Sequence, residues 1–130
     1  MNQLEKPVAE FQNADAVLQQ LNAQGILLPK RDELETYLDR HAELASLLDD
    51  MCKQARAAFG RTAELSLEVY NDPEIVDRYL TLYVRQDSYP SDIIDRIDAV
   101  CAGFHRSLES ASGYFLVTTD FRRPRGADAL

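Results

Sequence analysis

Few residues in this sequence have the types and spacing that catalysis or metal binding requires. The two histidines, His41 and His105, stand far apart, and neither is followed by a histidine or cysteine three or four residues later, as a zinc site needs. Cys101 and His105 are spaced to meet on a helix, but Cys101 lies within an apolar stripe, whereas a reactive thiol is exposed and near positive charge. The five glycines form no phosphate-binding loop. We therefore expect no metal, no cofactor and no catalytic dyad.

Polar and aromatic residues on three predicted strands form the strongest candidate for a functional surface. Residues 65–70 and 79–85 alternate apolar and polar side chains, and neighbouring side chains on a strand point to opposite faces of its sheet. The polar residues of both strands therefore share one face, and the end of a third strand brings a carboxylate and a basic cluster near them. The candidate interaction surface comprises Glu68, Tyr70, Tyr79, Tyr83, Arg85, Asp120, Arg122 and Arg123.

Three interpretations of this surface remain open at the level of sequence. Cross-strand pairs of such residues stabilise a sheet by themselves, by roughly 0.2–1 kcal/mol each. A partner protein would find tyrosines beside charged groups, a composition typical of interfaces. An enzyme of unrecognised class would use Glu68, Arg85 and Asp120 for its chemistry. The basic residues at 122–125 are expected to serve mainly as a solubilising tail.

The element that most strongly determines the fold is a long helix predicted over residues 30–59. Apolar residues recur there at intervals of three and four, which indicates one buried stripe. Asp32 and Glu35 have the spacing of a capping box, and Gly60 ends the helix. The stripe also follows a heptad pattern, so it packs on the first helix, on a partner helix or on a second copy in a homodimer.

The remaining segments give the order α-α-β-β-α-β. A short helix begins near Asn13 and ends at Gly25, and the apolar residues 26–28 after it must pack against something. A hairpin of two strands follows the long helix, and a second long helix, capped by Ser91, precedes a third strand over 114–121. The pattern predicts an α+β two-layer sandwich, with a three-stranded, mainly antiparallel sheet packed against two long helices.

The strand order has two solutions. We prefer the third strand beside the first, because that order makes every pair antiparallel. The alternative places it beside the second strand, in parallel, across a helical connection. Residues 13–121 are predicted to form a single domain, with a frayed segment at 1–12 and a loose tail at 122–130.

The charge of the chain points to the kind of partner. Its formal net charge is −8, which disfavours general binding to nucleic acids or to anionic membranes. Its longest apolar run near the N-terminus, residues 25–28, is too short for a membrane span or a signal sequence. With only two, widely separated cysteines, a cytoplasmic location is expected. The leading hypothesis is a non-catalytic interaction or regulatory module, and the acidic partner of a basic protein is one concrete form of it.

Overall fold

The structure, a computed structural model, describes residues 14–72, 74, 77–109 and 113–124. In chain order, its elements are α2 (Ala14–Ala23), α3 (Arg31–Arg40), α4 (Ala42–Phe59), β1 (Glu64–Asp72), β2 (Asp77–Arg85), α5 (Ile93–Glu109) and β3 (Phe115–Thr118). The described part is thus an α+β fold, as the sequence predicts, but it contains one helix more than predicted because the long helix is divided.

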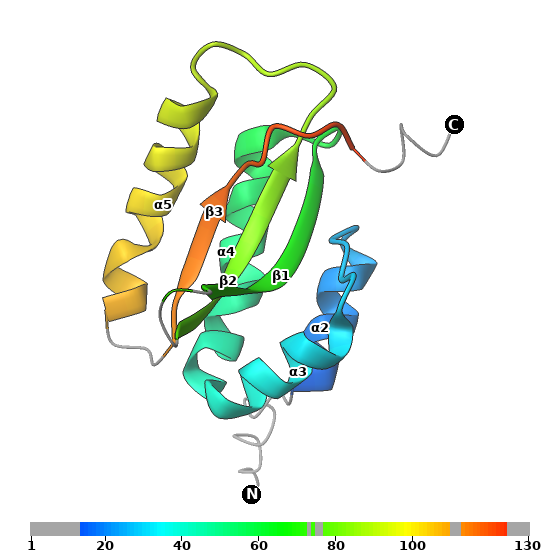
Figure 1. Cartoon of the computed structure of the whole chain (residues 1–130), viewed down its shortest axis with the longest axis vertical. Coiled ribbons are helices and arrows are strands. Elements are labelled where there is room, and N and C mark those ends of the chain that lie inside the picture. The colour runs from blue at the N-terminus through cyan, green and yellow to red at the C-terminus, as the bar shows by residue number, and fades with distance from the viewer. Residues whose placement is uncertain (1–13, 73, 75–76, 110–112, 125–130) are drawn as a thin grey trace, which may run out of the picture.

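The three strands form one mixed sheet in the order β1-β2-β3 (Figure 1). β1 and β2 are antiparallel, with Glu64 opposite Arg85 and Tyr70 opposite Tyr79. β3 pairs with β2 in parallel, with Leu80 opposite Phe115. The hairpin and its alternating pattern are confirmed, and both strands extend further into the connecting turn than the sequence indicates.

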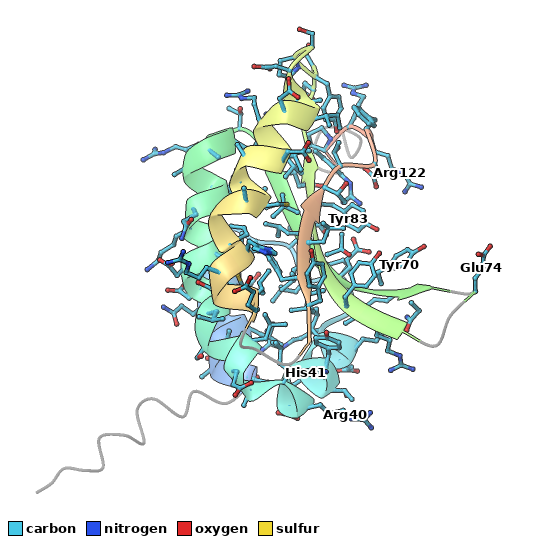
Figure 2. All side chains as sticks on the ribbon, turned by 90° about the vertical axis from the view of Figure 1, so that its left-hand side faces the viewer. Arg40, His41, Tyr70, Glu74, Tyr83 and Arg122 are labelled. Carbon is cyan, nitrogen blue, oxygen red and sulfur yellow. The ribbon has the colours of Figure 1, made fainter. Side chains whose placement is uncertain are left out.

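Helices α4 and α5 lie on one side of this sheet, and they bury its apolar face (Figure 2). That face carries fully buried side chains from all three strands, which pack on the buried stripes of α2, α3 and α4 in one core. Its central members are Leu65, Leu67, Leu80, Leu82, Val84, Phe115 and Val117. Burial of large apolar side chains, about 2 kcal/mol each, is the main source of stability for these layers.

The prediction of one helix over 30–59 is wrong. The helix breaks at His41, whose backbone (φ −130°, ψ 64°) ends α3 and begins α4. An unbroken helix of this length would span on the order of 45 Å, longer than the strands it covers. The break lets α3 turn away from α4 and pack against β1 and α2. Lys30 occupies the N-cap position, so Asp32 lies inside the first turn and does not cap the helix.

The preferred strand order, with the third strand beside the first, is also wrong. The outer edge of β1 is already occupied by residue 27: the Leu27 N–H donates to the Leu65 carbonyl at 2.8 Å, and the Leu67 N–H donates to the Leu27 carbonyl at 2.9 Å. The apolar connection 26–28 therefore packs on β1 and excludes β3 from that edge. The parallel alternative, with α5 as the crossover from β2 to β3, is the arrangement observed.

Other boundaries differ by a few residues. α5 begins at Ile93, two residues after the predicted cap at Ser91, and β3 is limited to four residues instead of the predicted eight. The predicted frayed segment at 1–12, the cap at Asn13 and most of the predicted tail lie outside the described residues.

Candidate functional site

The sheet has two faces of opposite character, and the candidate site is the face that α4 and α5 do not cover. Tyr70 and Tyr83 project from this open face, away from both helices (Figure 2). By the register of the strands, three rows of side chains cross it from β1 through β2 to β3. From the Arg85 end toward the hairpin, they are Ser66–Tyr83–Thr118, Glu68–Thr81–Leu116 and Tyr70–Tyr79–Tyr114.

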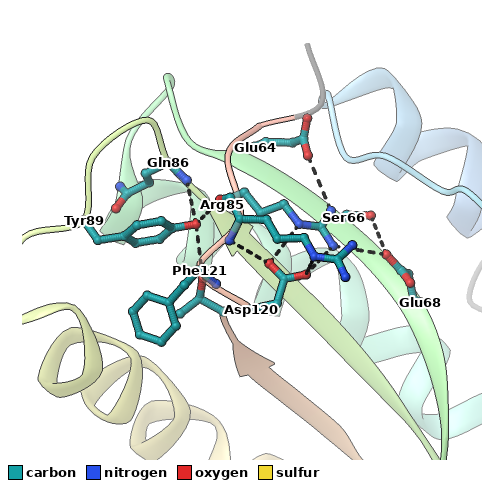
Figure 3. A network of polar contacts seen from close by, with 10 residues as sticks. Glu64, Ser66, Glu68, Arg85, Gln86, Tyr89, Asp120 and Phe121 are labelled. Carbon is teal, nitrogen blue, oxygen red and sulfur yellow. Dashed lines mark hydrogen bonds and ion pairs between the residues drawn. The ribbon is translucent and has the colours of Figure 1, made fainter. Parts of the chain in front are cut away.

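Arg85 organises one end of the open face (Figure 3). Its guanidinium binds Asp120 in a bidentate manner, with Nε–Oδ1 and Nη2–Oδ2 distances of 3.2 and 2.9 Å. Glu64 and Glu68 approach the same guanidinium at 3.5 and 3.7 Å. The Arg85 side chain is only 4% exposed, although no described helix lies over this face. The residues after β3, which cross the ends of β2 and β1, enclose it together with the three carboxylates.

The charges of this cluster shift the pKa values of its members. Burial alone would raise the pKa of Asp120, but hydrogen bonds from Arg85 and from the Arg122 N–H, with the charge of Arg85, hold it below its usual value. The hydrogen bond with Asp120 raises the pKa of Arg85 further above its already high value. Burial, followed by the charges of Glu68 and Asp120, raises the pKa of Tyr83. Three carboxylates thus surround one buried guanidinium in this cluster.

Three tyrosines form a continuous aromatic strip at the other end of the open face. The ring centroids of Tyr70 and Tyr79 are 5.2 Å apart, and those of Tyr79 and Tyr114 are 6.1 Å apart. Tyr70 and Tyr114 are 38% and 50% exposed, so both rings present apolar surface to solvent. The tyrosine strip (Tyr70, Tyr79 and Tyr114) thus runs from β1 through β2 to the residue that precedes β3.

A buried contact holds β3 in the position that completes this strip. The hydroxyl of Tyr37, from α3, accepts a hydrogen bond from the Tyr114 N–H at 3.0 Å and donates to the Arg78 carbonyl at 3.4 Å. Gly113 makes the close approach possible, because a Cβ there would lie 2.9 Å from Tyr37 Oη and from His41 Cγ. Its φ of +82° also favours glycine.

The middle row, Glu68–Thr81–Leu116, contains two acceptors that receive no hydrogen bond from the described part of the chain. Glu68 accepts a hydrogen bond from the Ser66 hydroxyl at 3.1 Å and approaches Arg85 at 3.7 Å. Both contacts involve its Oε2 atom, which leaves Oε1 as the acceptor without a contact among the described residues. Thr81 lies directly opposite Glu68 and is 2% exposed. Its Oγ1 has no hydrogen-bond partner among the described residues. Buried hydroxyls normally have one, so this row is the least satisfied part of the sheet.

The segment after β3 is fixed by the hydroxyl of Tyr89. This hydroxyl accepts from the Gln86 N–H at 3.2 Å, contacts Thr119 Oγ1 at 3.3 Å and donates to the Arg122 carbonyl. Phe121 is the single non-glycine residue with positive φ (+59°) in the described part of the chain, and its ring packs against Tyr89. This backbone conformation is strained for an aromatic residue. The described start of the predicted loose tail therefore makes specific contacts.

The structure brings six of the eight predicted surface residues onto the open face or its edge. Arg85 departs from the expectation, because it is buried and saturated with carboxylates rather than exposed to a ligand. Arg122 is highly exposed and reaches Asp120 at 3.7 Å, and Arg123 is exposed beside it. The candidate surface predicted from the sequence omits Thr81, Glu64 and Tyr114, although the alternation already places Thr81 on the face of Tyr79 and Tyr83. The alternation along β2 and β1 is sufficient to place Thr81 and Glu64 on the open face. The place of Tyr114 on this face follows only from the strand order.

The two cysteines and His105 lie in surroundings typical of side chains with a structural role. Burial raises the pKa of Cys52 to about 12, with a contribution from Asp49. Burial also raises the pKa of Cys101, whose thiol points to the Val117 carbonyl at 3.5 Å. His105 lies 3.2 Å from Glu109 on the exposed side of α5. Within the described ranges, no three histidine, cysteine or acidic side chains are grouped as metal ligands, and no helix has the length and apolarity to cross a membrane.

Comparison with known proteins gave no match: no family model, curated protein or solved structure is significantly similar to this chain.

Proposed function

We propose that this protein is a cytoplasmic, non-catalytic interaction module that binds a basic partner protein through the open face of its sheet. The observation that supports this proposal is the tyrosine strip, which crosses one end of the open face while a carboxylate-rich cluster lies at the other end. Tyrosine provides a large contact area at low entropic cost and is enriched among residues that dominate binding energy.

The charge of the chain supports a basic partner. Glu64, Glu68 and Asp120 surround a single buried guanidinium, and although the exposed Arg122 also reaches Asp120 at 3.7 Å, the chain as a whole has a net charge of −8. Complementary charge accelerates association and excludes partners of the wrong sign. A basic protein would therefore bind faster and more selectively than a neutral one, and its binding would weaken at high salt.

A homodimer through residues 30–59 receives less support than the open face. Most of its apolar stripe is buried against the chain's own elements, with Leu34, Leu44 and Leu48 fully buried. An enzyme using Glu68, Arg85 and Asp120 is also less favoured, because the guanidinium is committed to carboxylates and is shielded from an anionic substrate.

Site-specific photo-crosslinking tests the proposal. Benzoylphenylalanine is introduced in place of Tyr70 on the open face or in place of Ala57, an exposed residue of α4 in the helical layer, and each variant is irradiated in cells. We expect a specific adduct with a protein of net positive charge from position 70 and none from position 57. Equal adducts from both positions, or none from position 70, would overturn the proposal.

A further inference from the structure

We infer that the middle row of the open face is an arginine-binding site, which receives one arginine side chain from an extended, basic segment of the partner. This inference rests on the proposed function and specifies the chemistry that the open face recognises. It is carried by the unused acceptors Glu68 Oε1 and Thr81 Oγ1, which belong to directly opposed residues on β1 and β2.

The geometry of the row brings these acceptors together. Side chains of directly opposed antiparallel residues have Cβ atoms about 5 Å apart, a distance that one guanidinium spans. Glu68 is 27% exposed and provides access from solvent, whereas the Thr81 hydroxyl lies beneath the surface. A guanidinium beside Glu68 would supply the donor that the Thr81 hydroxyl lacks, and it would form an ion pair with the Glu68 carboxylate.

The neighbouring row favours arginine over lysine. The tyrosine strip lies two residues further along each strand, roughly 7 Å away, so a side chain that approaches Glu68 from the hairpin end of the sheet crosses the rings of Tyr70 and Tyr79. A guanidinium stacks on aromatic rings and donates several hydrogen bonds in a fixed plane, whereas an ammonium is a compact, strongly hydrated charge. The protein already contains one such contact, with the Arg85 guanidinium 5.1 Å from the Tyr83 ring centroid.

Two other surface features, the outer edge of β3 and the exposed Phe121 side chain, do not indicate a binding partner. The outer edge of β3 is covered, because Phe115 and Val117 are buried and Cys101 of α5 contacts the Val117 carbonyl. Strand addition by a partner at this part of the edge is therefore blocked. Phe121 is exposed, but its surroundings do not specify the chemistry of an occupant.

Titration with small probes, followed by amide chemical shifts of the ¹⁵N-labelled full chain, tests the site. Nα-acetyl-arginine amide is expected to cause saturable shifts at residues 66–70 and 79–83, with a dissociation constant on the order of 1 mM for a ligand of this size. Nα-acetyl-lysine amide is expected to bind at least threefold more weakly. Shifts spread over the acidic surface, or equal responses to both probes, would overturn the inference.

Two variants separate recognition from folding. Glu68→Gln is expected to weaken arginine binding at least tenfold, whereas Glu33→Gln, which removes the same charge from exposed α3, leaves it unchanged. Thr81→Val keeps the side-chain shape and is expected to weaken binding about threefold while the thermal midpoint stays equal or rises, since it removes an unpaired buried hydroxyl. Unchanged binding by Glu68→Gln in a folded protein would contradict the site.

The outcomes distinguish this inference from the proposed function. A basic partner crosslinked at position 70, combined with no saturable arginine response, would overturn the arginine site and leave the interaction surface in place. No crosslink at position 70 would overturn the proposed function. The arginine site would then no longer be supported as part of a partner-binding surface, even if the probe titration shows arginine binding.

Discussion

The side chains on the two faces of the sheet are buried in different ways. On the covered face, Leu67, Leu82 and Val117 meet in one row and are fully buried beneath the helices. On the open face, Arg85 and Thr81 are nearly as buried without any described helix above them. Arg85 is enclosed by carboxylates and by the segment after β3, whereas the Thr81 hydroxyl is buried with no hydrogen-bond partner in the described ranges.

The contrast separates the structural part of the molecule from the part available for binding. An apolar row needs only complementary shape and exclusion of water. A polar row is most stable when each donor and acceptor has a hydrogen-bond partner. A buried group without a partner lowers the stability of the fold, and a bound ligand can supply the missing hydrogen bond. On the open face, the Arg85 guanidinium is paired with carboxylates, whereas the Thr81 hydroxyl in the middle row has no partner among the described residues, so these two parts of the face are expected to differ in function.

The largest effect on stability is expected from truncating the covered face. Leu82→Ala should lower the free energy of unfolding by about 3 kcal/mol, because it leaves a cavity at the centre of the core. Leu116→Ala makes the same truncation on the open face, where the side chain is partly exposed, and should cost about 1 kcal/mol. Urea denaturation measures both, and equal losses would contradict the distinction between the faces.

The next largest effect is expected from removing the buried cation. Arg85→Met leaves three mutually repelling carboxylates, and should cost about 2 kcal/mol, less than a fully buried pair because these carboxylates retain access to water. Arg31→Met, which breaks the more exposed pair with Asp15, provides the control and should cost under about 1 kcal/mol. A loss no larger for Arg85→Met than for Arg31→Met would show that Arg85 does not organise this end of the sheet.

The ion pair of Asp120 predicts a specific response to acid. Because its pKa is lower in the folded than in the unfolded protein, Asp120 contributes stability above the unfolded pKa of about 4, and this contribution is lost as pH falls through the folded pKa. Asp120→Asn should therefore be less stable than the natural protein at pH 7, by about 1 kcal/mol. The difference should shrink below about pH 4 in unfolding measurements from pH 7 to pH 2, and a constant difference would be inconsistent with the pair.

A smaller effect is expected at Phe121, where the open face is bordered by strained backbone. Phe121→Gly should be more stable than Phe121→Ala by about 1 kcal/mol, because both remove the ring contact with Tyr89 but only glycine accepts a φ of +59° without strain. Thermal unfolding of the two variants compares them directly. A more stable alanine variant would mean that the positive φ is absent in solution.

The sequence allowed the composition of the open face to be predicted better than its arrangement. Alternation along β1 and β2 is sufficient to place Glu68, Tyr70, Tyr79 and Tyr83 together, because side-chain direction depends only on strand parity. The break at His41 was missed because the apolar spacing continues through it without change. Intervals of three and four report which side of a helix is buried, and they carry no signal of a bend.

Long-range contacts account for the other errors. The position of β3 depends on Leu27, which occupies the competing edge of β1 from a segment without strand character of its own. The strand order, in turn, brings Tyr114 into the tyrosine strip. The burial of Arg85 depends on Asp120, 35 residues further along the chain. Such contacts leave no local pattern, so only the structure reveals them.

The affinity of the crosslinked partner for two exposed-surface variants tests the central claim most directly. One variant carries Tyr70→Ser and Tyr114→Ser on the open face, and the other carries Ile94→Ser on α5, where a similarly large fraction of an apolar side chain is exposed. By isothermal titration calorimetry, we expect the tyrosine variant to bind at least tenfold more weakly and the Ile94 variant to bind as the natural protein does. Unchanged affinity of a folded tyrosine variant would contradict the assignment of the open face as the binding surface.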